Sequence, residues 1–222
     1  MKVMILAAGR GERMGNLTQN CPKPLLKVKG RCLIDWHLIK LCEAGFKDIV
    51  INVAYLSKEI IEFVGDGSKW GLNISISEEE HALETAGGIK KAMKYFGDEA
   101  FAVINADIFS DYNYENLKAR SLQNNSMGHL VLVNNPEHNL KGDFGIMDNG
   151  ILTMNSERSL TFSGIAIYDP KFFSELAEGN KIKLAPILEI AINKKCIQGE
   201  LFEGLWSDVG TPERLNMINL NE

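Results

Sequence analysis

The stretch that decides the fold is VMILAAGRGERMG, residues 3–15. An apolar run from Val3 to Ala8 ends abruptly in a loop that holds three glycines and two arginines. A short, fully apolar run is typical of a strand that is buried on both faces of a parallel sheet. We therefore predict a buried β-strand at residues 3–8, followed directly by a flexible, cationic loop.

Short apolar runs alternate with helical patterns as far as residue 134. This β-α rhythm predicts an α/β fold with a Rossmann-like, doubly wound, mostly parallel sheet and helices on both faces. The further strands are predicted at 48–54, 73–80, 101–107 and 129–134, and the helices at 33–45, 57–67, 85–97 and 114–125.

The rhythm changes after residue 135. Asn149-Gly150 lies between two short apolar runs, which is a strong hairpin signal. A strand at 160–168 and helices at 170–176 and 183–195 are expected to follow. We predict that this part forms an antiparallel extension on the same sheet. The 222 residues suit one domain, 1–222, with an N-terminal half 1–134 and a C-terminal half 135–222.

The charge is unevenly distributed along an acidic chain. The net charge is −5, yet the segment from Arg10 to Arg31 holds six cationic side chains against Glu12 alone. Such a patch favours a small polyanion as partner over a nucleic-acid polymer. No apolar run is long enough for a membrane span, so no membrane partner is expected. Only Met1 and Lys2 precede the first strand, so we expect no signal peptide and a cytoplasmic protein.

The loop after the first strand has the chemistry of an anion site. Ligands of open α/β sheets bind beyond the carboxyl ends of the strands, where this loop is expected. Gly9 and Gly11 let the backbone approach a ligand closely and allow positive φ, and their N–H groups can point at phosphate oxygens. Arg13 and Lys23 add positive charge. The spacing matches neither GxGxxG nor the P-loop, so an ordinary surface turn with scattered charges stays open.

Two acids are predicted at strand ends near this loop. Asp107 ends the run FAVINAD, and Asp208 lies in WSDVGT. Mg²⁺ takes one or two carboxylates together with substrate phosphates, so these acids are candidate metal ligands. The alternative for each acid is a solvated loop position or a helix cap.

Several motifs together resemble one family. LAAGRGERM, PKPLL, NAD and WSDVGT, in this order, resemble the sugar-1-phosphate nucleotidyltransferases. GDGSKWGLNISIS, ETAGG, GDFGI, TFSGIAIY and KLAPIL resemble in particular the N-acetylmuramic acid 1-phosphate uridylyltransferases of bacterial cell-wall recycling. Mannose-1-phosphate guanylyltransferases share many of these features. The resemblance implies a GT-A-like nucleotidyltransferase fold with a nucleotide-binding half, 1–134, and a sugar-binding half, 135–222.

The resemblance also implies roles for individual residues. The nucleotide would be held by Ala8, Gly9, Gly11, Glu12, Arg13, Lys23, Thr85, Gly88 and Asn105. The sugar would contact Asn105, Gly142 and Asp143, and Mg²⁺ would bind Asp107 and Asp208. The catalytic residues would be Arg13, Lys23, Asp107 and Asp208.

The implied reaction transfers a nucleotidyl group, from UTP, to a sugar 1-phosphate, N-acetylmuramic acid 1-phosphate, and releases pyrophosphate. ETAGG stands where these enzymes more usually have ETGGG, and NAD where Gly-Asp is commoner, so base and sugar identity stay open. A guanylyl- or cytidylyltransferase acting on mannose 1-phosphate or another phosphorylated sugar or alcohol is the alternative, and a non-catalytic nucleotide-binding regulator is a remote one. Lys181 or Lys183 is a candidate for the acceptor carboxylate, with solvated helix surface as the alternative. We expect a monomer or homodimer.

Overall fold

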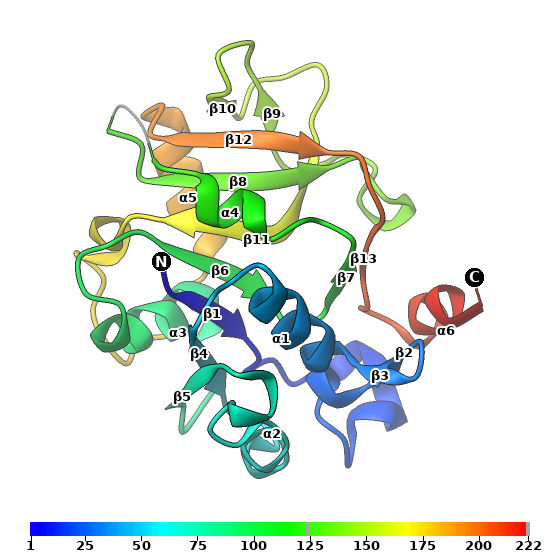
Figure 1. Ribbon diagram of the computed structural model, residues 1–222. Helices are drawn as coiled ribbons and strands as arrows, with labels where there is room; N and C mark the ends of the chain where they lie inside the picture. The colour runs from blue at the N-terminus through cyan, green and yellow to red at the C-terminus, as the bar shows by residue number, and fades with distance from the viewer. Residues whose placement is uncertain (123–124, 221–222) are drawn as a thin grey trace.

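A mixed sheet of seven strands forms the centre of the molecule (Figure 1). The computed structural model describes residues 1–122 and 125–220. The strand order is β12-β8-β11-β6-β1-β4-β5, and only β11 runs against its neighbours. The predicted mostly parallel α/β sheet is therefore confirmed. The strands are β1 (Val3–Leu6), β4 (Asp48–Val53), β5 (Asn73–Glu78), β6 (Phe101–Asn105), β8 (Gly128–Val133), β11 (Thr161–Tyr168) and β12 (Ile197–Phe202).

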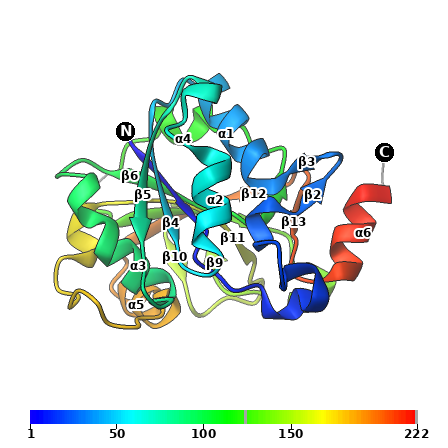
Figure 2. The same cartoon turned by 90° about the horizontal axis from the view of Figure 1, so that it is seen from below.

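Helices cover both faces of this sheet, as the apolar strands require. Val3 and Ile5 of β1 belong to the core cluster under one face, whereas Met4 belongs to the cluster under the other. Figure 2 shows α1 on one side of the sheet and α3 and α5 on the other. The helices are α1 (Leu33–Glu43), α2 (Ser57–Val64), α3 (Glu84–Ala92), α4 (Glu115–Ala119), α5 (Leu184–Asn193) and α6 (Pro212–Leu220). No helix in the described part of the chain is long and apolar enough to cross a membrane.

The C-terminal half contributes a strand to the middle of the sheet. β11 lies between β6 and β8 and is antiparallel to both. All but one of its residues are buried, which an interior strand requires and an edge strand does not. The predicted antiparallel element is thus an interior strand, so the two halves of the chain share one sheet.

Three short strand pairs surround the main sheet. The hairpin predicted around Asn149-Gly150 is confirmed, and Gly150 has a φ of 77° in its turn. A second pair brings a segment near the C-terminus beside the segment that follows β6. The pairs are β2 (Lys27–Val28) with β3 (Arg31–Cys32), β9 (Gly145–Ile146) with β10 (Leu152–Thr153), and β7 (Ile108–Ser110) with β13 (Trp206–Asp208).

Two predicted helices are much shorter than their sequence patterns suggest. The helix predicted at 114–125 ends at Ala119, because Arg120 turns to an extended conformation and its guanidinium pairs with Glu200 of β12. Residues 123–124 of that prediction lie outside the described residues. The helix predicted at 170–176 is a single 3₁₀ turn, Pro170–Phe173, in which both phenylalanines pack against Tyr168.

Candidate active site

A cavity of about 480 Å³ opens at the carboxyl ends of β1 and β6. The loop that follows β1, the start of α3 and the segment that follows β6 form its walls. This is the edge at which an α/β sheet binds its ligands, and the volume suits a small molecule. The structure therefore places the cationic loop at the binding edge predicted for it.

The loop after β1 supplies one wall through five predicted residues: Ala8, Gly9, Gly11, Glu12 and Arg13. Gly11 has a φ of 67°, and a Cβ there would lie 3.1 Å from Cγ2 of Thr18. The Thr18 hydroxyl donates to the Gly11 carbonyl at 3.0 Å and holds this turn. Of the two glycines that allow a positive φ, Gly11 adopts it, at the start of the 3₁₀ turn, and Gly9 does not.

Lys23 also lines the cavity, and its backbone is restricted by a proline on each side. It lies between Pro22, which is extended, and Pro24, and only 8% of the residue is exposed. Its ammonium donates to Oδ2 of Asp107, which also lines the cavity. Thr85 at the start of α3 and Asn105 at the end of β6 complete the set of predicted residues that face the cavity.

The two candidate metal ligands lie on neighbouring backbone segments. In the β7–β13 pair Asp208 lies opposite Ile108, and the Val209 amide donates to the Asp107 carbonyl at 2.8 Å. Asp208 does not itself line the cavity, but Gly210 does. The tertiary structure thus places on neighbouring segments two acids that are 101 positions apart in the sequence.

Three other predicted residues lie away from the cavity lining. A Cβ on Gly88 would lie 2.7 Å from Oε1 of Glu79, so the close packing under α3 requires a glycine there. Gly142 has a φ of 65° and packs against the backbone of Ser159. Oδ2 of Asp143 accepts from the Phe162 amide at 2.8 Å, which ties this loop to β11. Their roles toward nucleotide or sugar stay predictions.

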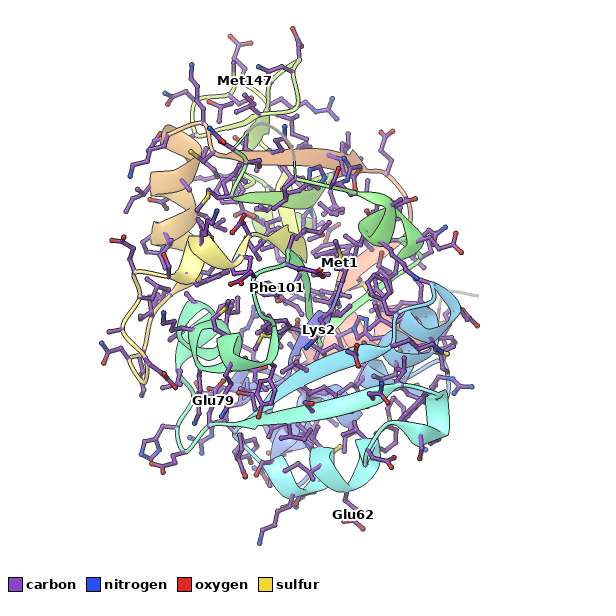
Figure 3. All side chains as sticks on the ribbon, turned by 60° about the vertical axis from the view of Figure 1, so that its left-hand side comes forward. Met1, Lys2, Glu62, Glu79, Phe101 and Met147 are labelled. Atoms are coloured by element: carbon purple, nitrogen blue, oxygen red, sulfur yellow. The ribbon has the colours of Figure 1, made fainter. Side chains whose placement is uncertain are left out.

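Sequence reasoning missed a buried polar network beneath the cavity. Oδ1 of Asn52 accepts from the Ala7 amide at 2.9 Å, and Nδ2 donates to Oε1 of Glu79 at 2.7 Å. The other oxygen of Glu79 accepts from the Leu83 amide at 2.9 Å. Both side chains line the cavity and each residue is 3% exposed; Glu79 directly follows β5 (Figure 3). An asparagine inside the apolar run DIVINV was the one available signal.

A buried histidine lies behind the segment that carries Asp107. Burial, together with the charge of Lys40, lowers the pKa of His37 to about 4. Its Nδ1 lies 2.8 Å from the Tyr114 hydroxyl. His37 is therefore neutral at physiological pH and adds no positive charge behind Asp107.

Comparisons with known proteins agree with this geometry. The chain is 46% identical to the N-acetylmuramate alpha-1-phosphate uridylyltransferase of Neisseria meningitidis, over 97% of this chain and 95% of that protein. It is 28% identical to the mannose-1-phosphate guanyltransferase of Gibberella zeae, over 96% of this chain and 62% of that protein. A Bacillus anthracis protein assigned as a glucose-1-phosphate thymidylyltransferase has the same fold, with a TM-score of 0.85, 22% identity and coverage of 99% and 94%.

The family model described as nucleotidyl transferase matches residues 2–222, which is nearly the whole chain. The motifs that resemble this family are spread over the same range, from the loop after β1 to the segment before α6. The predicted resemblance to sugar-1-phosphate nucleotidyltransferases is therefore confirmed: the chain belongs to the nucleotidyl transferase family.

Proposed function

We propose that this enzyme transfers a uridylyl group from UTP to N-acetylmuramic acid 1-phosphate and releases pyrophosphate, in the cytoplasm, as a step of peptidoglycan recycling. The observation that carries the proposal is the 46% identity, over nearly both full chains, to a protein named for this reaction. The cavity adds support, because nine of the residues assigned from the sequence line it.

The carboxylates of Asp107 and Asp208 are suitable ligands for a divalent cation that binds together with the nucleotide. Lys23 occupies one oxygen of Asp107 and Arg214 one oxygen of Asp208, and no hydrogen bond to the second oxygen of either acid is found among the described residues. Those residues also hold no cluster of three or more acidic, histidine or cysteine ligands. A two-carboxylate set suits Mg²⁺, which completes its coordination with phosphates and water. Asp107 and Asp208 would hold Mg²⁺, which supplies charge neutralisation and alignment of the phosphates.

The loop and Lys23 are the nucleotide side of the proposed site. Backbone N–H groups around Gly9 and Gly11 would donate to phosphate oxygens. Arg13 and Lys23 would stabilise the charge on the α-phosphoryl group and on the departing pyrophosphate. Ala8, Glu12, Thr85, Gly88 and Asn105 complete the nucleotide contacts that we propose.

The chemistry needs positioning rather than a strong base. An oxygen of the sugar 1-phosphate attacks the α-phosphorus in line, and the bond from that phosphorus to the bridging oxygen of pyrophosphate breaks. The attacking oxygen is already ionised at pH 7, so no residue has to take a proton from it, and no covalent enzyme intermediate forms. The residues around the cavity hold the two substrates in this alignment.

The sugar side of the site is assigned to Asn105, Gly142 and Asp143. Lys181 and Lys183 are the candidates for the lactyl carboxylate of the acceptor. Both are exposed, and they flank Ile182, whose carbonyl accepts from the first turn of α3 at 3.0 Å. The segment that carries them is thus attached to the helix that borders the cavity, which supports this assignment.

The similarity to a mannose-1-phosphate guanyltransferase keeps guanylyl transfer as the second candidate. Incubating the protein and Mg²⁺ with UTP, GTP or CTP, each against N-acetylmuramic acid, N-acetylglucosamine and mannose 1-phosphates, separates the possibilities through pyrophosphate release. We expect the fastest release from UTP with N-acetylmuramic acid 1-phosphate. A preference for GTP with mannose 1-phosphate would replace this assignment, and no release from any pair would favour a non-catalytic nucleotide-binding protein.

A further inference from the structure

Arg214 contacts one of the two proposed metal ligands directly. It lies in the first turn of α6, and its Nη1 donates to Oδ1 of Asp208 at 2.5 Å. The same Nη1 lies 2.7 Å from Nε2 of His138, which is itself 3.0 Å from Oδ1 of Asp208. The Arg214 side chain is only 11% exposed, so this contact is partly shielded from water.

The backbone is shaped to let this guanidinium pass. A Cβ on Gly210 would lie 2.0 Å from Nη2 of Arg214 and 3.0 Å from Oδ2 of Asp208. The glycine at this position leaves room for the Arg214 guanidinium beside Asp208. Thr211 accepts from the Arg214 amide at 3.4 Å and holds the start of the helix. The run SDVGTPER, residues 207–214, is thus one structural unit around the carboxylate.

We propose that Arg214 is a positioning residue that fixes the orientation of Asp208 for the metal. This inference rests on the metal role proposed for Asp208. Arg214 engages Oδ1, and no hydrogen bond to Oδ2 is found among the described residues; the next residue but one, Gly210, lines the cavity. Through His138, it also ties the turn at 137–139 to this carboxylate.

Two effects of Arg214 on a bound cation oppose each other. Its positive charge repels the cation, so removing the charge alone would tighten binding. Its hydrogen bond fixes the carboxylate, and losing a partner of this kind typically costs roughly 10–100-fold in metal affinity or activity. Because Arg214 is already paired with Asp208, its charge is largely compensated, and we expect the loss of orientation to dominate. If removal of Arg214 weakens cation binding, the residue positions Asp208; if removal tightens cation binding, its effect is charge repulsion alone.

Mn²⁺ binding in the presence of UTP, measured by electron paramagnetic resonance, tests this without any turnover. We expect Arg214→Gln to raise the dissociation constant for Mn²⁺ about 10-fold or more. Arg214→Lys keeps the positive charge, but the lysine side chain is shorter and lacks the planar guanidinium with its several fixed donors. We therefore expect this variant to lose most of the affinity for Mn²⁺ as well. Wild-type or tighter binding by Arg214→Gln, or full restoration by Arg214→Lys, would overturn the inference. If thermal unfolding shows that Arg214→Gln does not fold, the Mn²⁺ affinity of Arg214→Lys tests the inference in its place.

The chain offers a matched control in a second arginine–carboxylate pair. Arg120→Gln removes the partner of Glu200 in β12, and neither residue lines the cavity. We expect this variant to bind Mn²⁺ like the wild type. Wild-type Mn²⁺ affinity in Asp208→Asn would refute the metal role and this inference together. Absence of uridylyl transfer to the acceptor would refute only the proposed function, because the Mn²⁺ measurement needs no acceptor.

Discussion

Lys23 and Asp107 form an ion pair across 84 positions of sequence, at the edge of the cavity that both residues line. The Lys23 side chain is 10% exposed and the Asp107 side chain is 31% exposed. Each acid proposed to bind Mg²⁺ thus has a cation on one oxygen: Lys23 on Asp107 and Arg214 on Asp208. A bound triphosphate would offer Lys23 a second anionic partner in the same cavity. We therefore expect nucleotide binding to weaken the ion pair between Lys23 and Asp107.

Replacing Asp107 tests its role toward the metal. We expect Asp107→Asn to lower turnover by roughly 10²-fold or more, because a neutral amide neither neutralises nor firmly holds a divalent cation. The fold should stay intact, since the side chain lies at a cavity edge. Steady-state rates of pyrophosphate release and a circular dichroism spectrum measure the two effects. Normal turnover would rule out the metal role.

Replacing Lys23 tests whether it contacts phosphates. Lys23→Ala should weaken the use of UTP much more than the binding of uridine, because only the triphosphate offers charge to the ammonium. KM and kcat for UTP, with the inhibition constant of uridine measured beside them, give the comparison. Equal losses for UTP and uridine would mean that the variant disturbs the cavity as a whole.

The packing under α3 predicts an effect on stability. A Cβ on Gly88 would lie 2.7 Å from Oε1 of Glu79 and 2.8 Å from Nδ2 of Asn52, both buried. We expect Gly88→Ala to lower the free energy of unfolding by about 1–3 kcal/mol, the usual cost of overpacking. Gly9→Ala is the matched control for stability, because nothing lies within 4 Å of a Cβ there. Urea denaturation measures both, and equal stability of the two variants would contradict the packing argument.

His37 predicts a dependence of stability on pH. Its pKa is lowered from 6.5 to about 4 in the folded protein, so the unfolded chain binds more protons between these values. The contribution of this group to the free energy of unfolding is therefore complete above pH 6.5 and falls as the pH decreases. At pH 5 the loss is about 2 kcal/mol.

The measurement is urea denaturation of the wild type and of His37→Gln at pH 7.5 and pH 5. Carboxylates elsewhere titrate in both proteins, so only the difference between them reports His37. We expect a smaller decrease in the variant. The same decrease in both proteins would show that His37 does not stay neutral in the folded state.

Sequence alone was enough for the order of the main elements and for nine of the residues that line the cavity. Apolar strands followed by loops determine that Gly11 and Asp107 lie at one edge of the sheet, because the carboxyl ends of parallel strands share an edge. The grouped positive charges from Arg10 to Arg31 indicated an anion site from the sequence alone. These signals come from residues that are close together in the sequence, so they predict single strands and loops rather than contacts between distant segments.

Only the tertiary structure decided which side chains meet. Asn52 joins Ala7 and Glu79 across 45 and 27 positions, and Arg214 meets His138 across 76. It also decided that Gly88 packs closely against Glu79 and Asn52, and that β11 enters the middle of the sheet. Neither periodicity nor composition encodes such pairings, because they arise when distant segments compete to fill the same space and to satisfy buried polar groups.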